Sequence, residues 1–228
     1  MKSEDLRAGL GIRSVTVARD PTAGKGLRLD DNGRIPASLL NLTTYRKTSS
    51  KTVNTSTTET DLLNSEITIA ANAIGPNGLV RIVAAGDWKQ NSGAASGPPR
   101  LKLKLASTTL VDTGAGNATG IGNSASRFPW RVDALIQNLG ATNAQWVTFR
   151  SVFGLVRTAT TSFNAPTTGE GEFYSLSDGG ATEEYVANLG NSATVDTTAA
   201  VALVLSTINA SANAAYEVVL KHALVEII

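Results

Sequence analysis

The sequence predicts an all-β protein: a jelly-roll-like antiparallel β-sandwich of about eight strands, preceded by an extended N-terminal arm with a short helix. First, apolar and polar residues alternate with a period of two, as in Leu101–Leu105, where leucines alternate with lysines. Second, turn-forming residues separate these segments, and no segment after residue 60 shows a helical period. Third, small polar residues are abundant whereas charged residues make up only 17% of the chain. Such usage suits strands and tight turns.

The N-terminal part of the chain differs from the rest. It begins with a segment that could form one or two helical turns, with Ser3 as the N-cap. Residues 43–60 are rich in threonine and serine and lack an apolar face, which favours a linker or extended arm. We therefore expect an attachment arm and polar linker over residues 1–58 and the β-sandwich over 59–228. The alternative is that the first part covers an edge of the same domain, since edge strands need covering.

Eight strands are expected after the linker, separated by turn sequences such as Gly-Pro-Asn-Gly at 75–78. They lie at about 65–74, 79–88, 100–112, 127–138, 145–157, 182–187, 199–207 and 215–227.

The faces of two strands can be assigned by alternation. Along 127–138, Phe128, Trp130 and Val132 share one side and Arg131 and Asp133 the other, which is typical of an antiparallel sheet with one dry face. The last strand is apolar on both sides. This predicts either a central strand or an interface with another subunit. The interface residues would be Tyr216, Val218, Leu220, His222 and Leu224.

Composition excludes several kinds of chemistry. The chain has no cysteine, so it has no disulfide and no thiolate metal site, and its one histidine, His222, cannot by itself form a multi-histidine zinc site. A net charge of +1 gives no field that would attract nucleic acid. No apolar run approaches a membrane span, and acids replace the apolar region of a signal peptide near the N-terminus. We expect synthesis in a cytoplasm, no membrane insertion, no cofactor, no metal and no catalysis.

Two other groups of residues are candidates for a functional role. The acid pairs Asp30–Asp31, Glu170–Glu172 and Glu183–Glu184 could serve a glycosidase only if two carboxylates faced one cleft. Glu183 and Glu184 are adjacent and would point to opposite faces of a strand, and in loops we expect these acids to be solvated instead. The three tryptophans, Trp88, Trp130 and Trp146, could stack on sugar rings if exposed, but core or interface anchoring is the simpler interpretation.

Several segments resemble structural proteins of tailed bacteriophages. They are DLLNSEITIA at 61–70, GDWKQNSG at 86–93, PPRLKLKL at 98–105, TTLVDTG at 108–114 and RFPWRVDALIQNLGATNAQW at 127–146. The resemblance is to virion β-sandwich proteins of the head-fibre, decoration or tail-appendage kind, and it covers roughly residues 60–228. In addition, DDNGRIPASLL at 30–40 is similar to sequences near the attachment ends of phage fibres. These motifs are strands and loops of a scaffold, not the signature of an active site.

The resemblance implies a homotrimeric, jelly-roll-like projection on the virion, made in the host cytoplasm and held to capsid or tail proteins by its N-terminal arm. The apolar residues expected to carry attachment are Leu6, Leu10, Ile12, Ile35, Leu39 and Leu40. One alternative is a receptor-binding module that recognises a host surface glycan through loops 89–99, 113–126 and 164–182. A third possibility, a polysaccharide depolymerase, rests only on the scattered acids.

Overall fold

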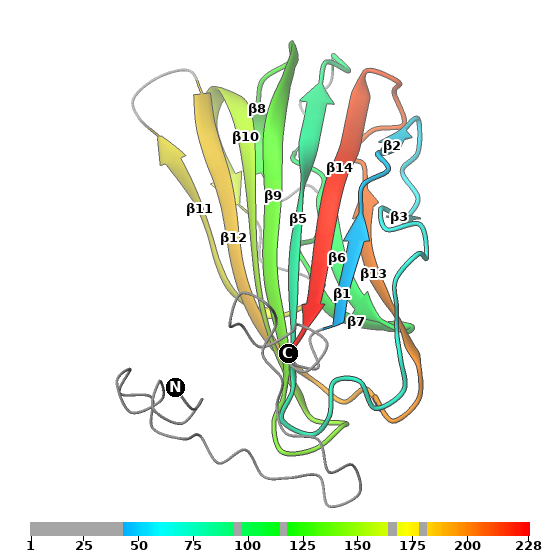
Figure 1. Ribbon diagram of the computed structural model, residues 1–228. Coiled ribbons are helices and arrows are strands. Elements are labelled where there is room, and N and C mark those ends of the chain that lie inside the picture. The colour runs from blue at the N-terminus through cyan, green and yellow to red at the C-terminus, as the bar shows by residue number, and fades with distance from the viewer. Residues whose placement is uncertain (1–42, 94–96, 115–117, 164–167, 178–181) are drawn as a thin grey trace, which may run out of the picture. The chain divides into compact units, whose positions relative to one another are not determined.

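The computed structural model describes residues 43–93, 97–114, 118–163, 168–177 and 182–228, and every regular element in these ranges is a β-strand (Figure 1). The strand pairings among the described residues are antiparallel, which confirms the predicted fold class at the level of an all-β antiparallel protein. In chain order the strands are β1 (Thr43–Lys47), β2 (Lys51–Asn54), β3 (Thr60–Asp61), β4 (Thr68–Ile69), β5 (Leu79–Gln90), β6 (Arg100–Leu105), β7 (Thr108–Asp112), β8 (Ala118–Ile121), β9 (Ser124–Asn138), β10 (Gln145–Phe163), β11 (Glu170–Ser177), β12 (Thr182–Ala193), β13 (Val201–Ile208) and β14 (Tyr216–Ile227).

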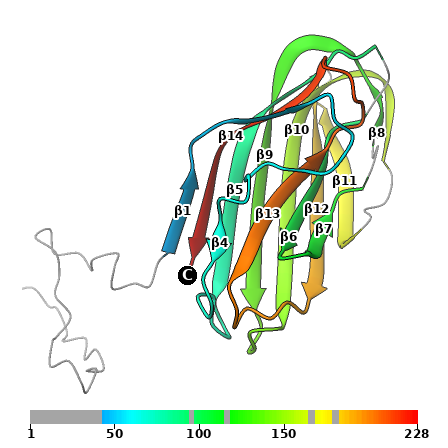
Figure 2. The ribbon, with the colours of Figure 1, turned by 90° about the vertical axis from the view of Figure 1, so that its right-hand side faces the viewer.

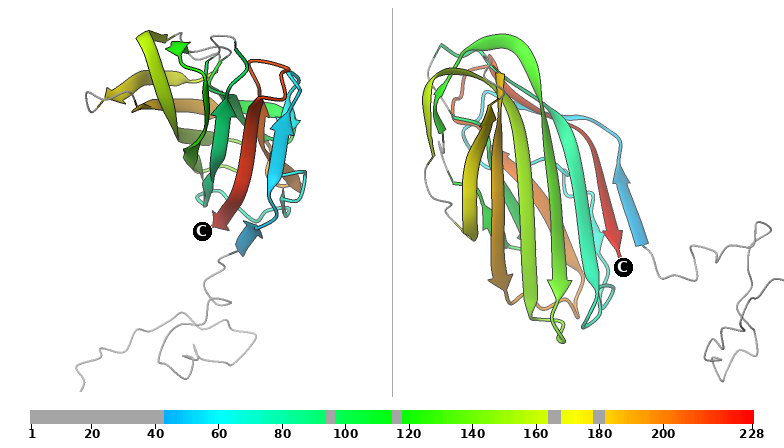
Figure 3. Two further views of the ribbon diagram at one scale, coloured as in Figure 1. Left: turned by 90° about the horizontal axis from the view of Figure 1, so that it is seen from above. Right: turned by 90° about the vertical axis from the view of Figure 1, so that its left-hand side faces the viewer.

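The strands form two sheets that enclose one core (Figures 2 and 3). The large sheet has nine strands in the order β1-β14-β5-β9-β10-β12-β11, with β2 also on β14 and β8 also on β10. The small sheet has five strands in the order β3-β13-β6-β7, with β4 also on β13. The chain changes sheets between β2 and β3, β4 and β5, β5 and β6, β7 and β8, β12 and β13, and β13 and β14. Because β5 pairs with β14 and β6 pairs with β13, the β5–β6 and β13–β14 crossings run side by side.

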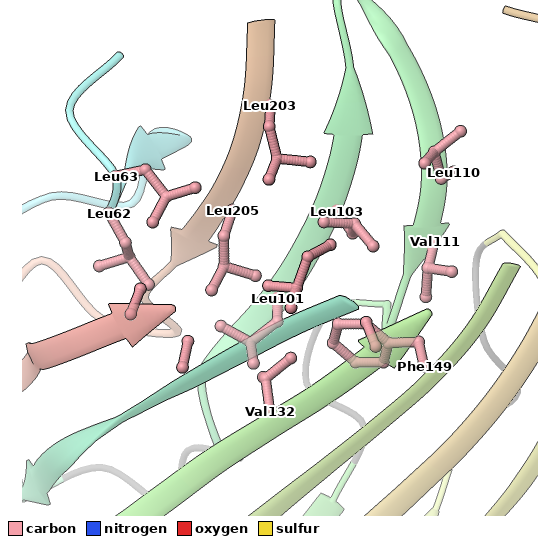
Figure 4. Packing of buried hydrophobic residues seen from close by; sticks show 14 of the residues in the cluster. Leu62, Leu63, Leu101, Leu103, Leu110, Val111, Val132, Phe149, Leu203 and Leu205 are labelled. Atoms are coloured by element: carbon pink, nitrogen blue, oxygen red, sulfur yellow. The ribbon is translucent and has the colours of Figure 1, made fainter. Parts of the chain in front are cut away.

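The core lies between the sheets and is built by alternation. Leu101, Leu103 and Leu105 of β6 are fully buried, whereas the lysines between them face outward. They meet inward residues of the large sheet such as Val132 and Phe149 (Figure 4). At about 25 cal/mol per Å² of apolar surface, each fully buried leucine contributes roughly 2 kcal/mol relative to exposure. Within Leu79–Leu105, β5 belongs to the large sheet and β6 to the small sheet. The polar connection between them therefore joins the two sheets, and the two strands do not pair as a hairpin.

An aromatic cluster closes the core toward one end. The ring of Trp88 meets Phe153 edge to face, with centroids 5.9 Å apart, and its Nε1 donates to Gly154 O at 2.8 Å. Trp130 Nε1 donates to Val219 O at 3.1 Å. Both indoles are thus buried with their polar atom satisfied, as a buried tryptophan requires.

Strand boundaries depart from expectation where turns lack the usual residues. The segment 100–112 is not one strand but two, because a turn at Ala106–Ser107 joins β6 to β7, with Ala106 in the left-handed region at φ 50°. The segment 65–74 contributes only β4, since Asn72 also takes a positive φ. Strand β11 (Glu170–Ser177) was not expected at all.

Residues 43–54 lie within the compact unit, which begins at Thr43. Strand β1 pairs with β14 from Thr43↔Ile227 to Lys47↔Ala223, and β2 pairs with β14 further along. This polar stretch therefore covers the edge of the large sheet, which is the alternative that the sequence left open for it. Few residues of β1 and β2 are buried, so the stretch needs no apolar face. The helix expected near Ser3 lies outside the described residues.

Candidate functional site

The described unit has two distinct ends. At one end lie Thr43, where residues 1–42 join the sheet, and the C-terminal Ile228, which exchanges two backbone hydrogen bonds with Leu79. At the other end lie the connections from β5 to β6 and from β13 to β14, where Asn91 N donates to Ala215 O at 3.1 Å. Thr43 and these connections therefore lie at opposite ends of the described unit (Figure 1).

The end that bears Thr43 is fixed by a buried polar network. Gln145, which is 1% exposed, donates from Nε2 to Asn138 Oδ1 at 2.8 Å and to Val195 O at 3.1 Å, and its Oε1 accepts from Val195 N. Asn138 Nδ2 in turn donates to Gly75 O and Thr197 Oγ1. The network ties three loops together, and a satisfied buried network of this kind makes their arrangement rigid.

The residues expected to attach the chain, Leu6, Leu10, Ile12, Ile35, Leu39 and Leu40, all lie outside the described residues. So do parts of the loops expected to recognise a glycan, namely 94–96, 115–117, 164–167 and 178–181. The attachment role and the loop-recognition role therefore stay predictions.

The residues expected at a subunit interface do not share one face. Tyr216, Val218 and Leu220 are fully buried in the chain's own core, which accounts for their apolar character. A β-bulge between Leu220 and His222 shifts the alternation, so His222 is exposed and Leu224 half-buried on the outer face. Strict alternation would put His222 on the same side as Leu220, and the bulge puts it on the opposite side. β14 is an internal strand, with β1 and β2 on one side and β5 on the other. Neighbouring side chains therefore cover part of its second face, which accounts for the apolar residues there.

Most described carboxylates have basic partners. On the outer face of the small sheet, Asp112 accepts two hydrogen bonds from Arg100, at 2.6 and 2.5 Å, and Glu59 accepts from Lys102 and Lys104 at 3.0 and 2.8 Å. Desolvation tends to raise the pKa of Glu59, but the hydrogen bonds from Lys104, Lys102 and Ser206 outweigh it and lower that pKa to about 2. Desolvation also tends to raise the pKa of Asp112. The hydrogen bond from Arg100 outweighs this effect, so the pKa of Asp112 is lowered.

The acids weighed for catalysis do not come together as a dyad in the described residues. Glu170 and Glu184 are both exposed, on β11 and β12, and the side chains of Glu172 and Glu183 as well as Asp30 and Asp31 fall outside what the structure describes. The carboxyl pKa shifts that are resolved, at Glu59, Asp112 and Asp196, all go downward. A glycosidase general acid needs a raised pKa, so these resolved groups are charge partners rather than proton donors.

The outer face of the large sheet carries a shallow trough across β5, β9, β10 and β12. It consists of two adjoining depressions of about 500 and 610 Å³ that share Asp133 and Arg150. Small residues form much of its floor, among them Ala85, Gly86 and Gly154. Gly86 has to be glycine, because a Cβ there would lie 1.8 Å from Val219 O. The sheet pairing thus makes the trough shallow and continuous.

The trough is bordered by a tryptophan on an exposed strand face. Trp146 is 45% exposed, unlike Trp88 and Trp130, which are 1% and 2% exposed. Its six-membered ring lies over Gly190 of β12, where an added Cβ would sit 3.2 Å from Cζ2. Leu135, 39% exposed, faces the same side on β9. Core anchoring describes Trp88 and Trp130, whereas the exposed Trp146 leaves the interface and the sugar-stacking interpretations open.

The charges of the trough are only partly balanced. Arg131 forms a bidentate pair with Asp133, at 2.7 and 2.9 Å, and Arg81 pairs with Glu226 at 3.2 Å. Arg150 lies between Asp133 and Asn188 in register and has no hydrogen bond or ion pair with any described residue. Sequence alternation places Arg150 on the outer face, but it cannot show that its neighbour's carboxylate is taken by Arg131.

Comparison with family models, curated proteins and solved structures finds no match to this chain. Among the described residues, no group of three or more histidine or acidic side chains could hold a metal ion. The described part of the chain likewise has no helix of the length and apolarity needed to cross a membrane.

Proposed function

We propose that this chain is a structural component of a bacteriophage virion: a short, trimeric, jelly-roll-like projection or decoration held to the capsid or tail by an N-terminal arm that includes a short helix. It has no catalytic role in this proposal. The resemblance of the strand and loop sequences to virion proteins motivates it.

One structural observation supports it most directly. The compact unit begins at Thr43, and residues 1–42 join it at the end that the Gln145 network makes rigid. A firm base at the point of attachment suits a projection that has to hold its direction. The side-by-side crossings of β5–β6 and β13–β14 support the jelly-roll part, because such parallel crossings of strand pairs occur when a long hairpin wraps into two sheets.

Location on a particle is tested with an antibody against residues 43–228 applied to intact virions of the phage that encodes the chain. We expect label at a fixed position on the capsid or tail, and loss of incorporation when residues 1–42 are deleted. Purified virions that lack the chain would contradict the proposal.

The trimer is tested separately by light scattering on the full-length protein. One chain has a mass of 23.7 kDa, so three chains would give about 71 kDa. A mass of one chain at micromolar concentration would contradict the trimer while leaving attachment open. Recognition of a host glycan through the loops remains the alternative, and cell-adsorption assays with the purified protein test it. Depolymerase activity predicts turnover of capsular polysaccharide that disappears in Glu170→Gln or Glu172→Gln, and we expect no turnover.

A further inference from the structure

The exposed indole of Trp146 is held in a defined position. Its ring lies over Gly190, and its own strand position is fixed by Gln137 on one side and Ser192 on the other. Leu135 extends the apolar surface on the neighbouring strand. Exposed aromatic rings fixed against a backbone suit ligands that have one apolar face, and the C–H face of a pyranose ring is such a ligand surface.

Polar groups continue from this platform along the same face. Thr148 follows Trp146 on the outer side of β10, and Arg150 follows Thr148. The indole lies over Gly190, which pairs with Thr148, so along the strand it is two residues, or about 7 Å, from Arg150. A carboxylate on Arg150 would therefore belong to the sugar next to the one on the indole. Asn188 and Asp133 flank Arg150 in register, within the depression of about 500 Å³.

The charge at Arg150 selects among sugars. Its guanidinium has no described ion-pair partner, whereas the neighbouring Asp133 is already bound by two nitrogens of Arg131. A free guanidinium binds a carboxylate with two parallel hydrogen bonds. Glu184 is exposed at the far end of the trough and disfavours an anion there. The anionic group of a ligand would therefore lie on the Trp146 side.

We propose that the Trp146–Arg150 face of the large sheet binds an acidic oligosaccharide, with one ring on the indole and the carboxylate of the next ring on Arg150. This site lies on a sheet face and not in the loops expected to recognise a glycan. It depends neither on virion location nor on the trimer.

The test uses the full-length protein with tetragalacturonate and with its methyl ester, which keeps the rings and removes the charge. Binding is measured by calorimetry and by acrylamide quenching of tryptophan fluorescence. Because Trp88 and Trp130 are buried, quenching reports mainly on Trp146. We expect tetragalacturonate to bind and to protect the quenchable tryptophan, and the methyl ester to bind about tenfold more weakly, as loss of a charge-assisted hydrogen bond predicts.

Two variants and a matched control locate the site. Trp146→Ala should abolish binding and Arg150→Gln should weaken tetragalacturonate about tenfold without changing the affinity for the ester. Arg46→Gln, at an exposed arginine of β1 outside the trough, should leave both affinities unchanged. Thermal melts confirm that each variant is folded.

Four results would overturn the proposal. The first three are no binding of tetragalacturonate, equal binding of acid and ester, and equal loss of affinity in Arg46→Gln and Arg150→Gln. A fourth is a change of oligomeric state in Trp146→Ala without any saccharide effect in the parent protein, which would assign this face to a second copy of the chain.

Discussion

On the outer face of the small sheet every basic side chain of β6 has a carboxylate partner, whereas on the outer face of the large sheet Arg150 has none among the described residues. Arg100, Lys102 and Lys104 are half-buried and share Asp112 and Glu59, so their charges stabilise the sheet edge and the segment before β3. The large sheet instead presents an open trough beside an exposed tryptophan. Charge alone therefore does not distinguish the two faces. Only on the large sheet does a charge without a partner among the described residues lie beside open surface.

The largest effect is expected from breaking the small-sheet cluster at Asp112. The Asp112→Asn variant keeps the side-chain shape but leaves Arg100, whose side chain is 20% exposed, without its charge partner. Removing one partner of a largely buried pair typically costs several kcal/mol, so we expect the free energy of unfolding to fall by about 3 kcal/mol at pH 7. Urea denaturation measures it. A loss as small as that of an exposed pair would show that this face is no more structural than the other.

A pH series of unfolding sharpens the comparison at Glu59. Its folded pKa of about 2 lies below the value of 4.5 usual for a glutamate, so its contribution to stability is present above about pH 4.5 and is lost as the pH falls toward 2. Glu59→Gln should cost about 1 kcal/mol at pH 7, a value reduced for solvent screening because the side chain is 30% exposed. The difference between parent and variant should vanish near pH 2. A difference that is constant with pH would show that packing, not charge, is responsible.

A smaller effect is expected at Arg127 on the large sheet. This guanidinium bridges Asp87 of β5 and Glu217 of β14, but its side chain is 39% exposed. Arg127→Gln should lower the free energy of unfolding by about 0.5 kcal/mol, and the loss should shrink in 1 M salt because exposed pairs are screened. Thermal melts at two salt concentrations check both statements. A salt-independent loss would point to the packing of the side chain over the sheet instead.

The smallest effect on stability is expected at Asp133. Its pair with Arg131 has side chains 57% and 41% exposed, so Asp133→Asn should change the free energy of unfolding by no more than about 0.3 kcal/mol. The same change frees a second guanidinium in the trough and should strengthen tetragalacturonate binding about twofold. Urea denaturation and calorimetry on one preparation measure both. Weaker binding would mean that Asp133 itself contacts the ligand.

Local patterns predicted much of the fold. Period-two alternation located β5, β9, β10 and β14 to within a few residues over most of their length, because a strand with one buried face has to alternate. It missed the turn at Ala106–Ser107 because alanine is not a turn former and one serine without glycine, proline, asparagine or aspartate is a weak turn signal. It also missed β1 and β2, whose polar residues need only hydrogen bonds from β14.

The candidate site was less predictable. Alternation places Trp146 and Arg150 on the outer face of one strand, and the exclusion of thiol and multi-histidine chemistry follows from composition alone. The bulge after Leu220, which turns His222 outward, has no signature in the residues around it.

The sequence by itself determined the class of the protein: all-β, antiparallel, with leucines inward and lysines outward on β6. These properties follow from the order of residues within single strands. Only the tertiary structure decided which strands lie side by side, that residues 43–54 belong to the sheet edge, and that Arg131 takes Asp133 while Arg150 has no partner within the described part of the chain. Those facts depend on contacts between segments far apart in the chain, and no local pattern records which of several possible partners a side chain meets.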